Sequence, residues 1–196
     1  MTDLKAYLYE KVKPIIETWD EDGIYAISFF VYANGAYTYQ QYSNVSLFAI
    51  SYNTEKDCGN APWDCETRWN YAFWRQNTTN IINPDEDNDE GMKVLFQWYK
   101  ENGIENIGLE DSSNMYDENY FYIGKGPVGY YELLTMVSQV ARQLQTEGLI
   151  SQKFGKIPII VHALEDCWYI KEATAHANPN GEADDYIKSM YEYNER

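Results

Sequence analysis

The spacing of apolar residues predicts a helix at the start of the chain, between Asp3 and Trp19. Its apolar positions recur every three or four residues, at Leu4, Leu8, Val12, Ile15 and Ile16. Thr2 or Asp3 can supply the oxygen that caps the first turn. Pro14 lies inside this segment, so we expect a kink or an early break near Lys13.

After Gly23 the pattern becomes typical of β-strands. Ile24–Tyr32 is rich in β-branched and aromatic residues, and Asn34-Gly35 directly after it is a strong hairpin signal. We therefore expect a second strand to begin near Ala36. Val45–Tyr52 predicts a further strand, which gives an antiparallel sheet nucleus in the first third of the chain.

Helical patterns dominate the rest of the chain. They predict helices over Met92–Lys100 and Glu165–Ala177, a last helix that contains Tyr186, Met190 and Tyr193, and a short buried strand at Pro158–Val161. The clearest helix has one apolar stripe and stops at Gly148; the stripe consists of Tyr130, Leu133, Leu134, Val137, Val140, Ala141 and Leu144. The sequence thus predicts a single α+β domain over residues 1–196, with an antiparallel nucleus packed against several helices.

Charge narrows the choice of partner. The chain has 31 acidic and 15 basic residues, a net charge of −16, which repels phosphate backbones and anionic lipids. We expect no nucleic-acid or membrane partner, and a protein with a basic surface would be attracted. The chain start lacks the features of a signal peptide and no stretch is long and apolar enough to span a bilayer, so a soluble, cytoplasmic protein is expected. Alternatively, the charge only maintains solubility.

Residues for nucleophilic or metal chemistry are few. His162 and His176 are the only histidines, and a pair of His162 with Cys167 remains an alternative to a structural histidine. The three cysteines, Cys58, Cys65 and Cys167, are expected to be reduced, and whether any is reactive stays open. A zinc site built from them and His162 would lack the usual spacing. No catalytic residue, metal or cofactor is predicted.

An acidic run at residues 85–90 has two interpretations. Asp85, Asp87 and Asp89 alternate as in a calcium-binding loop, but Glu90 and Phe96 stand where an EF-hand needs glycine and glutamate. The favoured interpretation is a solvated acidic cap on the following helix. The alternative is a weak ion site, which could serve a carboxylate-based hydrolase with a divalent ion.

An aromatic cluster surrounds Arg68, formed by Trp63, Trp69, Phe73 and Trp74. Trp, Tyr and Arg are the residues that dominate protein interfaces, so the cluster could be a recognition surface. The alternative is a small satellite core that fixes a loop or a short helix to the sheet.

Four segments resemble a bacterial family known as the domain-of-unknown-function 4303 family: Gly23–Ser28, Thr67–Trp74, Ile157–His162 and Ala177–Pro179. The likeness covers most of the chain in order, and its motifs are largely apolar and aromatic. The resemblance implies a compact α+β domain without an assigned catalytic residue. It also implies a similarity to small proteins encoded beside polymorphic toxins, which are usually immunity proteins.

The resulting hypothesis is a non-catalytic acidic binding protein, and the resemblance implies one of the immunity type that binds and neutralises a basic toxin. The alternatives are the hydrolase and an uncharacterised soluble scaffold protein. The predicted partner-binding residues are acidic or aromatic and were expected to share one face: Asp85, Glu86, Asp87, Asp89, Glu90, Asp111, Asp117, Glu118, Trp69 and Trp74.

Overall fold

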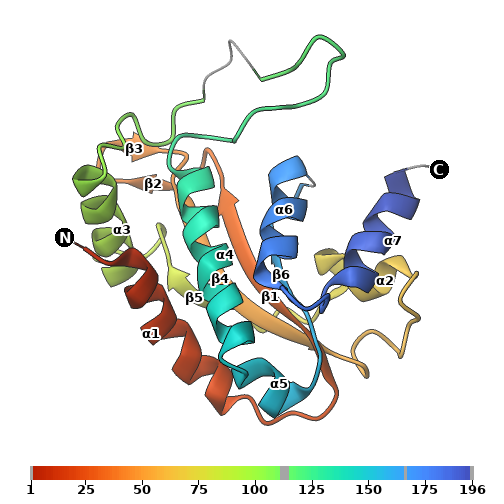
Figure 1. The fold of residues 1–196 in the computed structure, drawn as a ribbon. Coiled ribbons are helices and arrows are strands. Elements are labelled where there is room, and N and C mark those ends of the chain that lie inside the picture. The colour runs from red at the N-terminus through yellow and green to blue at the C-terminus, as the bar shows by residue number, and fades with distance from the viewer. Residues whose placement is uncertain (1, 111–114, 166, 195–196) are drawn as a thin grey trace.

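The sheet is built around one long apolar strand, β1 (Ile24–Ala33). In the computed structural model, which describes residues 2–110, 115–165 and 167–194, β1 lies between two partners. It pairs antiparallel with β4 (Ser46–Thr54) and parallel with β6 (Ile159–His162). β5 (Thr79–Ile82) adds to the outer side of β4, which gives the order β5-β4-β1-β6 (Figure 1). The predicted α+β class is confirmed, and the parallel β6 makes the sheet mixed.

The connection between β1 and β4 differs from the predicted hairpin. Asn34-Gly35 does form a turn, but the chain then folds into a separate two-stranded hairpin of β2 (Thr38–Tyr39) and β3 (Tyr42–Ser43). The strand expected near Ala36 is therefore wrong as a partner of β1. The physical reason is burial: β4 is buried along almost its whole length, whereas β2 and β3 are half-buried or exposed and offer little apolar surface to a core.

Three helices cover one face of the sheet: α1 (Leu4–Thr18), α4 (Tyr130–Thr146) and α6 (Trp168–Ala177) (Figure 1). α3 (Glu90–Glu101) lies beside α1, and the short α5 (Leu149–Phe154) follows α4. All seven residues of the predicted apolar stripe of α4 are buried, so that prediction is confirmed. Alternate residues of β1 complete this core, namely Ile27, Phe29 and Val31.

The proline inside α1 does not break the helix. Asp3 caps α1 by accepting a hydrogen bond from the Ala6 N–H (2.9 Å), and the helix continues through Pro14 to Thr18. The break expected near Lys13 is absent. Proline removes one backbone hydrogen bond, and the buried residues Leu4, Leu8, Val12 and Ile16 of α1 offset that loss, since α1 packs on α4.

The opposite face of the sheet is covered by an irregular aromatic segment and by the last helix. The segment contains α2 (Glu66–Trp69) and the 3₁₀ turn η1 (Tyr71–Phe73), and the last helix is α7 (Asp184–Asn194). A second apolar cluster forms there, in which Trp74 and Tyr186 pack on Ile160 of β6. The predicted satellite core is confirmed only in part, because Trp74 and Trp69 belong to this cluster whereas Phe73 is 54% exposed and lies outside it.

The outer edge of β6 is paired with the side chains of Thr174 in α6 and of Asn178, which caps the end of α6; among the described residues no further strand lies beside this edge. Thr174 Oγ1 accepts from the Val161 N–H (3.1 Å) and donates to the Val161 carbonyl (2.7 Å). Asn178 pairs with Ile159 in the same way: its Oδ1 accepts from the Ile159 N–H (2.9 Å), and its Nδ2 donates to the Ile159 carbonyl (2.7 Å). The polar backbone groups of this edge are thus satisfied inside the protein.

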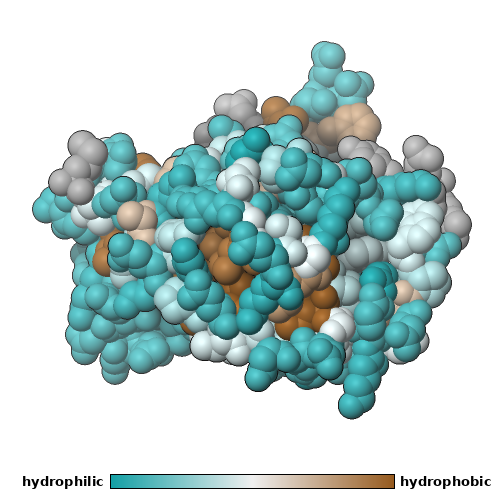
Figure 2. All heavy atoms as spheres, turned by 60° about the horizontal axis from the view of Figure 1, so that its bottom comes forward, coloured by the Kyte–Doolittle hydropathy of each residue, from teal (hydrophilic) through white to brown (hydrophobic). Residues whose placement is uncertain are grey.

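Hydrophilic residues cover most of the face at the α5 end of the molecule, with small hydrophobic patches near its centre (Figure 2). Within the described ranges, no helix is both long and apolar enough to cross a bilayer.

Candidate functional site: an aromatic pocket and an exposed tip

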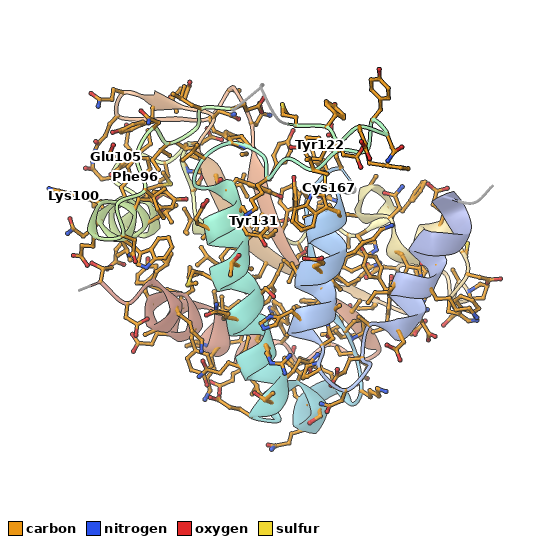
Figure 3. The ribbon with its side chains drawn as sticks, turned by 45° about the horizontal axis from the view of Figure 1, so that its top comes forward. Phe96, Lys100, Glu105, Tyr122, Tyr131 and Cys167 are labelled. Atoms are coloured by element: carbon orange, nitrogen blue, oxygen red, sulfur yellow. The ribbon has the colours of Figure 1, made fainter. Side chains whose placement is uncertain are left out.

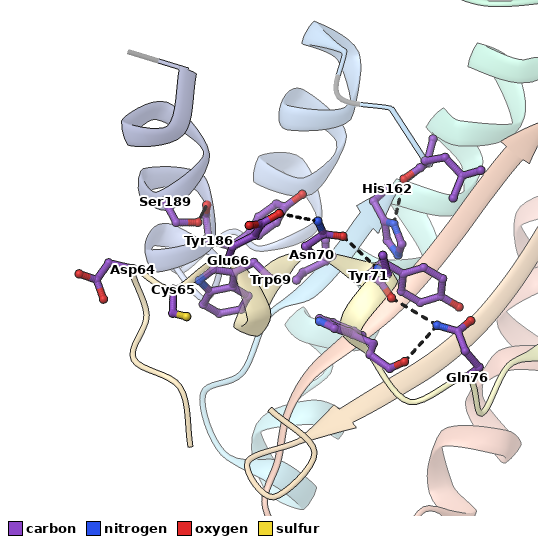
Figure 4. A pocket seen from close by; sticks show the side chains of 15 residues that line it. Asp64, Cys65, Glu66, Trp69, Asn70, Tyr71, Gln76, His162, Tyr186 and Ser189 are labelled. Carbon is purple, nitrogen blue, oxygen red and sulfur yellow. Dashed lines mark hydrogen bonds between the residues drawn. The ribbon is translucent and has the colours of Figure 1, made fainter. Parts of the chain in front are cut away.

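A cavity of about 460 Å³ lies between the aromatic segment, the end of β6 and α7 (Figure 4). Four aromatic side chains line it, Trp69, Tyr71, Trp74 and Tyr186, and we call it the aromatic pocket. The rings are fixed by one another: Trp69 and Tyr186 meet edge to face at 5.7 Å, and Tyr71 lies 5.9 Å from Trp74. The pocket is therefore preformed and has the volume of a small-molecule site.

Arg68 holds the aromatic segment on the sheet. Its guanidinium donates two hydrogen bonds to the Glu55 carboxylate (2.7 and 2.8 Å) and one to the Ala61 carbonyl (2.9 Å). It also stacks on the Tyr25 ring, 4.0 Å from the ring centre. The hydrogen bonds from Arg68 lower the pKa of Glu55, which keeps the pair charged. The Arg68 backbone contributes as well, since its carbonyl accepts from Trp74 Nε1 (2.9 Å). Both the side chain and the backbone of Arg68 therefore anchor the segment.

His162 lies in the wall of the pocket and is a structural histidine. Its Nε2 is 2.6 Å from Ser28 Oγ, and its Nδ1 is 3.2 Å from the Ala163 carbonyl. We assign the Nδ1–H tautomer from these partners, because a carbonyl only accepts and Ser28 can donate to Nε2. Ser28 is fully buried and cannot reach a substrate. The side-chain partner of His162 is Ser28 rather than Cys167, which fits the structural interpretation.

The buried His162 makes stability depend on pH. Burial lowers its pKa from 6.5 to about 4, so the unfolded chain binds a proton at a pH where the folded protein does not. The contribution is fully present above pH 6.5 and is lost as the pH falls toward 4. We expect the free energy of unfolding to fall by about 2 kcal/mol between roughly pH 7 and 5, measured by urea unfolding.

Two variants test whether His162 causes this pH dependence of stability. H162Q removes the titrating group and is expected to flatten the profile between about pH 7 and 5. H176Q is the matched control, because His176 is exposed and should contribute much less. Equal slopes for wild type and H162Q would show that His162 is not the group responsible.

The acidic run before α3 forms a helix cap, as the favoured interpretation predicted. Asp89 accepts from the Met92 N–H (2.7 Å) at the start of α3, and Glu90 forms an ion pair with Lys11 (2.8 Å). Asp85, Glu86 and Asp87 are exposed in the turn before it. These carboxylates stabilise the helix start and do not converge on a cavity.

A second set of predicted residues lies in a protruding turn, residues 115–124, which we call the tip. Asp117 Oδ1 accepts from the N–H groups of Asn119 (2.8 Å) and Phe121 (2.9 Å), and Glu118 is exposed beside it. Trp168 Nε1 of α6 donates to the Gly124 carbonyl (3.0 Å) and ties the tip to the helices. In Figure 3, Tyr122 lies above the N-terminal ends of α4 and α6, near Tyr131 and Cys167. Asp111 lies outside the described residues.

The predicted partner-binding residues do not form one surface. α3 with its acidic cap lies on the opposite side of the molecule from α2, and the tip projects beyond both (Figure 1). Trp69 and Trp74 both line the aromatic pocket, and Trp74 is only 4% exposed because it is also part of the second apolar cluster. The expected acidic and aromatic face is therefore divided into three places.

Sequence reasoning missed most of the pocket. Tyr71 lies in the aromatic segment that the sequence singled out, whereas His162 and Tyr186 come from distant segments that only the fold brings near it. Among the described residues, no group of three or more His, Cys, Asp or Glu could hold a metal ion. The two carboxylates at the pocket, Asp64 and Glu66, are both exposed.

Comparisons with known proteins found no matching family model, no matching curated protein and no matching solved structure. The resemblance to the domain-of-unknown-function 4303 family therefore stays a prediction. Function has to be argued from the residues themselves.

Proposed function

We propose that this chain is a non-catalytic cytoplasmic binding protein whose partner is a protein with a basic surface. The specific form that we propose is an immunity-type protein of the family that its sequence resembles, which would neutralise a basic toxin. The tip carries this proposal, because it presents large apolar side chains to solvent on a locally ordered turn.

The apolar side chains of the tip are unusually exposed. Tyr120 is 87% and Phe121 69% exposed, and Tyr116 and Ile123 on either side are also exposed. Contiguous exposed apolar groups are costly to leave in water and commonly mark interaction sites. Aromatic residues are also the most frequent anchors in protein interfaces.

The conformation of the tip supports a binding role. Its backbone is closed by hydrogen bonds from Asp117 N–H to the Phe121 carbonyl (2.9 Å) and from Ile123 N–H to the Met115 carbonyl (2.8 Å). Tyr120 has a φ of 64°, a left-handed conformation that residues with a side chain rarely adopt. A strained aromatic residue held by its turn is preorganised for contact with a partner.

Charge favours a basic partner. The only charged residues of the tip are Asp117 and Glu118, and the whole chain carries −16. Acidic groups around an aromatic anchor accelerate association with a basic surface and repel acidic ones. For a toxin that acts on nucleic acid, such carboxylates could occupy the groove meant for phosphates. The hydrolase alternative would need converging carboxylates, and neither Asp64 nor Glu66 is buried.

The test uses the full chain as bait in its native host. The wild-type chain is compared with a double variant that combines Tyr120→Gly and Phe121→Ser. This double variant removes both anchors and relieves the strain at Tyr120, so the fold is expected to persist. We expect wild type to retain a basic protein, and the variant to bind the purified partner at least about 100-fold more weakly by calorimetry, as expected for interface anchors.

The matched control is Phe73→Ser, which changes an aromatic residue that is 54% exposed elsewhere. It should leave partner binding unchanged. Raising the salt concentration should slow association of the wild-type complex, since the partner is steered by charge. An acidic partner, or one that the double variant binds as tightly, would contradict the proposal.

A further inference from the structure

We propose that the aromatic pocket binds a small organic cation, an ammonium or guanidinium group on an apolar body. The site is separate from the tip and does not depend on the proposed function. Its volume of about 460 Å³ suits a small ligand, and its lining combines aromatic rings with carboxylates and contains no lysine or arginine.

The rings supply the attraction for a cation. Trp69, Tyr71, Trp74 and Tyr186 surround the cavity, and the π face of such rings is electron-rich. Beside the pocket one cation is already held in this manner, because the Arg68 guanidinium lies 4.0 Å from the centre of the Tyr25 ring of β1 and 5.3 Å from that of Trp69. An apolar ligand body would also cover Leu164, which lines the pocket and is 62% exposed.

The polar groups of the lining disfavour an anion. Asp64 and Glu66 are its charged residues, and both are acidic. His162 has both ring nitrogens bonded, to Ser28 and to the Ala163 carbonyl, so it offers the pocket neither a positive charge nor a free donor. The Gln76 amide donates to the Trp74 carbonyl (3.0 Å) and is likewise engaged. A phosphate or carboxylate would lose its hydration without gaining a cationic partner.

The position of the carboxylates sets the orientation of the ligand. Asp64 and Glu66 precede and begin α2, and they are exposed while the rings and His162 lie deeper. In Figure 4, Asp64 is directed away from the rings, at the outer end of the pocket. We therefore expect the apolar body to contact the rings and the cationic group to lie toward the carboxylates.

The experiment titrates the full chain with three probes of similar shape: 2-phenylethylammonium, 2-phenylethanol and 3-phenylpropionate. Binding is followed by NMR at the indole N–H groups of Trp69 and Trp74. We expect the cation to bind at least about tenfold more tightly than the alcohol, and the anion to bind most weakly. Equal affinities for the cation and the anion, or no binding of any probe, would overturn the proposal.

Two double variants, each of which removes two carboxylates, distinguish binding in the pocket from a general effect of the negative charge of the protein. D64N/E66Q should weaken binding of the cation about fivefold and leave binding of the alcohol unchanged, since both side chains are exposed and keep their shape. D85N/E86Q removes the same charge from the exposed turn before α3 and should change neither. An equal loss of affinity in the two variants would overturn the assignment to the pocket.

A last arm identifies the source of the cation. The same chemistry could come from a free amine or from an arginine side chain of another protein. We therefore add N-acetyl-glycyl-arginyl-glycinamide as a fourth probe. Tighter binding of 2-phenylethylammonium assigns the pocket to a free aromatic amine, and tighter binding of the peptide assigns it to a protein side chain.

Discussion

Asn178→Ala is expected to lower the free energy of unfolding by about 4 kcal/mol, because four hydrogen bonds to buried groups are lost and each group left without a partner costs about 1–3 kcal/mol. Asn178 is 5% exposed and accepts hydrogen bonds from the Ile159 N–H and from Gln145 Nε2, at 2.9 and 3.0 Å. It donates to the carbonyls of Ile159 and Thr174, both at 2.7 Å. Urea unfolding with both a fluorescence and a far-ultraviolet signal would measure the loss.

Two further variants test whether the lost hydrogen bonds of Asn178 cause the destabilisation. Asn178→Asp keeps the shape but removes the two donated hydrogen bonds, so it should also destabilise strongly. Asn180→Ala is the matched control, because Asn180 is exposed and its side chain donates to the Glu182 carboxylate (3.0 Å); it should cost less than about 0.5 kcal/mol. A loss below about 1 kcal/mol for Asn178→Ala would mean that water replaces these bonds and that the edge of β6 is open to solvent.

Arg68→Ala is expected to destabilise the protein by about 3 kcal/mol, through loss of a largely desolvated ion pair and of packing on Tyr25. The Arg68 side chain is 15% and the Glu55 side chain 39% exposed, so solvent screening lowers the value from that of a fully buried pair. The aromatic segment should detach locally, which hydrogen exchange at Trp69 and Trp74 would report.

Arg68→Lys tests the geometry of this contact. Lysine keeps the charge but lacks the planar fork that bonds both Glu55 oxygens, so we expect it to recover less than half of the lost stability. Arg142→Ala is the control, since the Arg142 side chain donates to an exposed backbone carbonyl, that of His176 (2.8 Å). If Arg68→Lys were as stable as wild type, charge alone would suffice and the bidentate geometry would be irrelevant.

The periodic parts of the fold could be predicted from the sequence. α4 was predicted because its buried positions repeat every three or four residues, and β1 because a run of β-branched and aromatic residues needs burial on both faces. β5 was missed because its first two residues are exposed and its sequence, Thr-Asn-Ile-Ile, is short. The pairing of β1 with β4 depends on which strand fills the core, and local turn signals at Asn34-Gly35 carry no information about that.

At the candidate sites, too, features set by neighbouring residues could be predicted, whereas those set by tertiary packing could not. Asp89 was predicted as part of a helix cap, since capping depends on neighbouring residues only. The aromatic pocket could not be predicted, because His162 and Tyr186 join Tyr71 through tertiary packing. At Asn178 the sequence predicts only the end of a helix before Pro179, and no neighbouring residue indicates that its side-chain amide pairs with Ile159.

The pairing of β6 with Thr174 and Asn178 also limits how this protein can meet another chain. Many domains recruit extended peptides by adding them as a new strand to a free sheet edge, and the same property makes such edges prone to amyloid growth. Here the main-chain groups of Ile159 and Val161 are already engaged, so a peptide has no ladder to join at that edge. Recognition on this side must be made by side chains, which links selectivity to individual residues and protects the protein from templated aggregation.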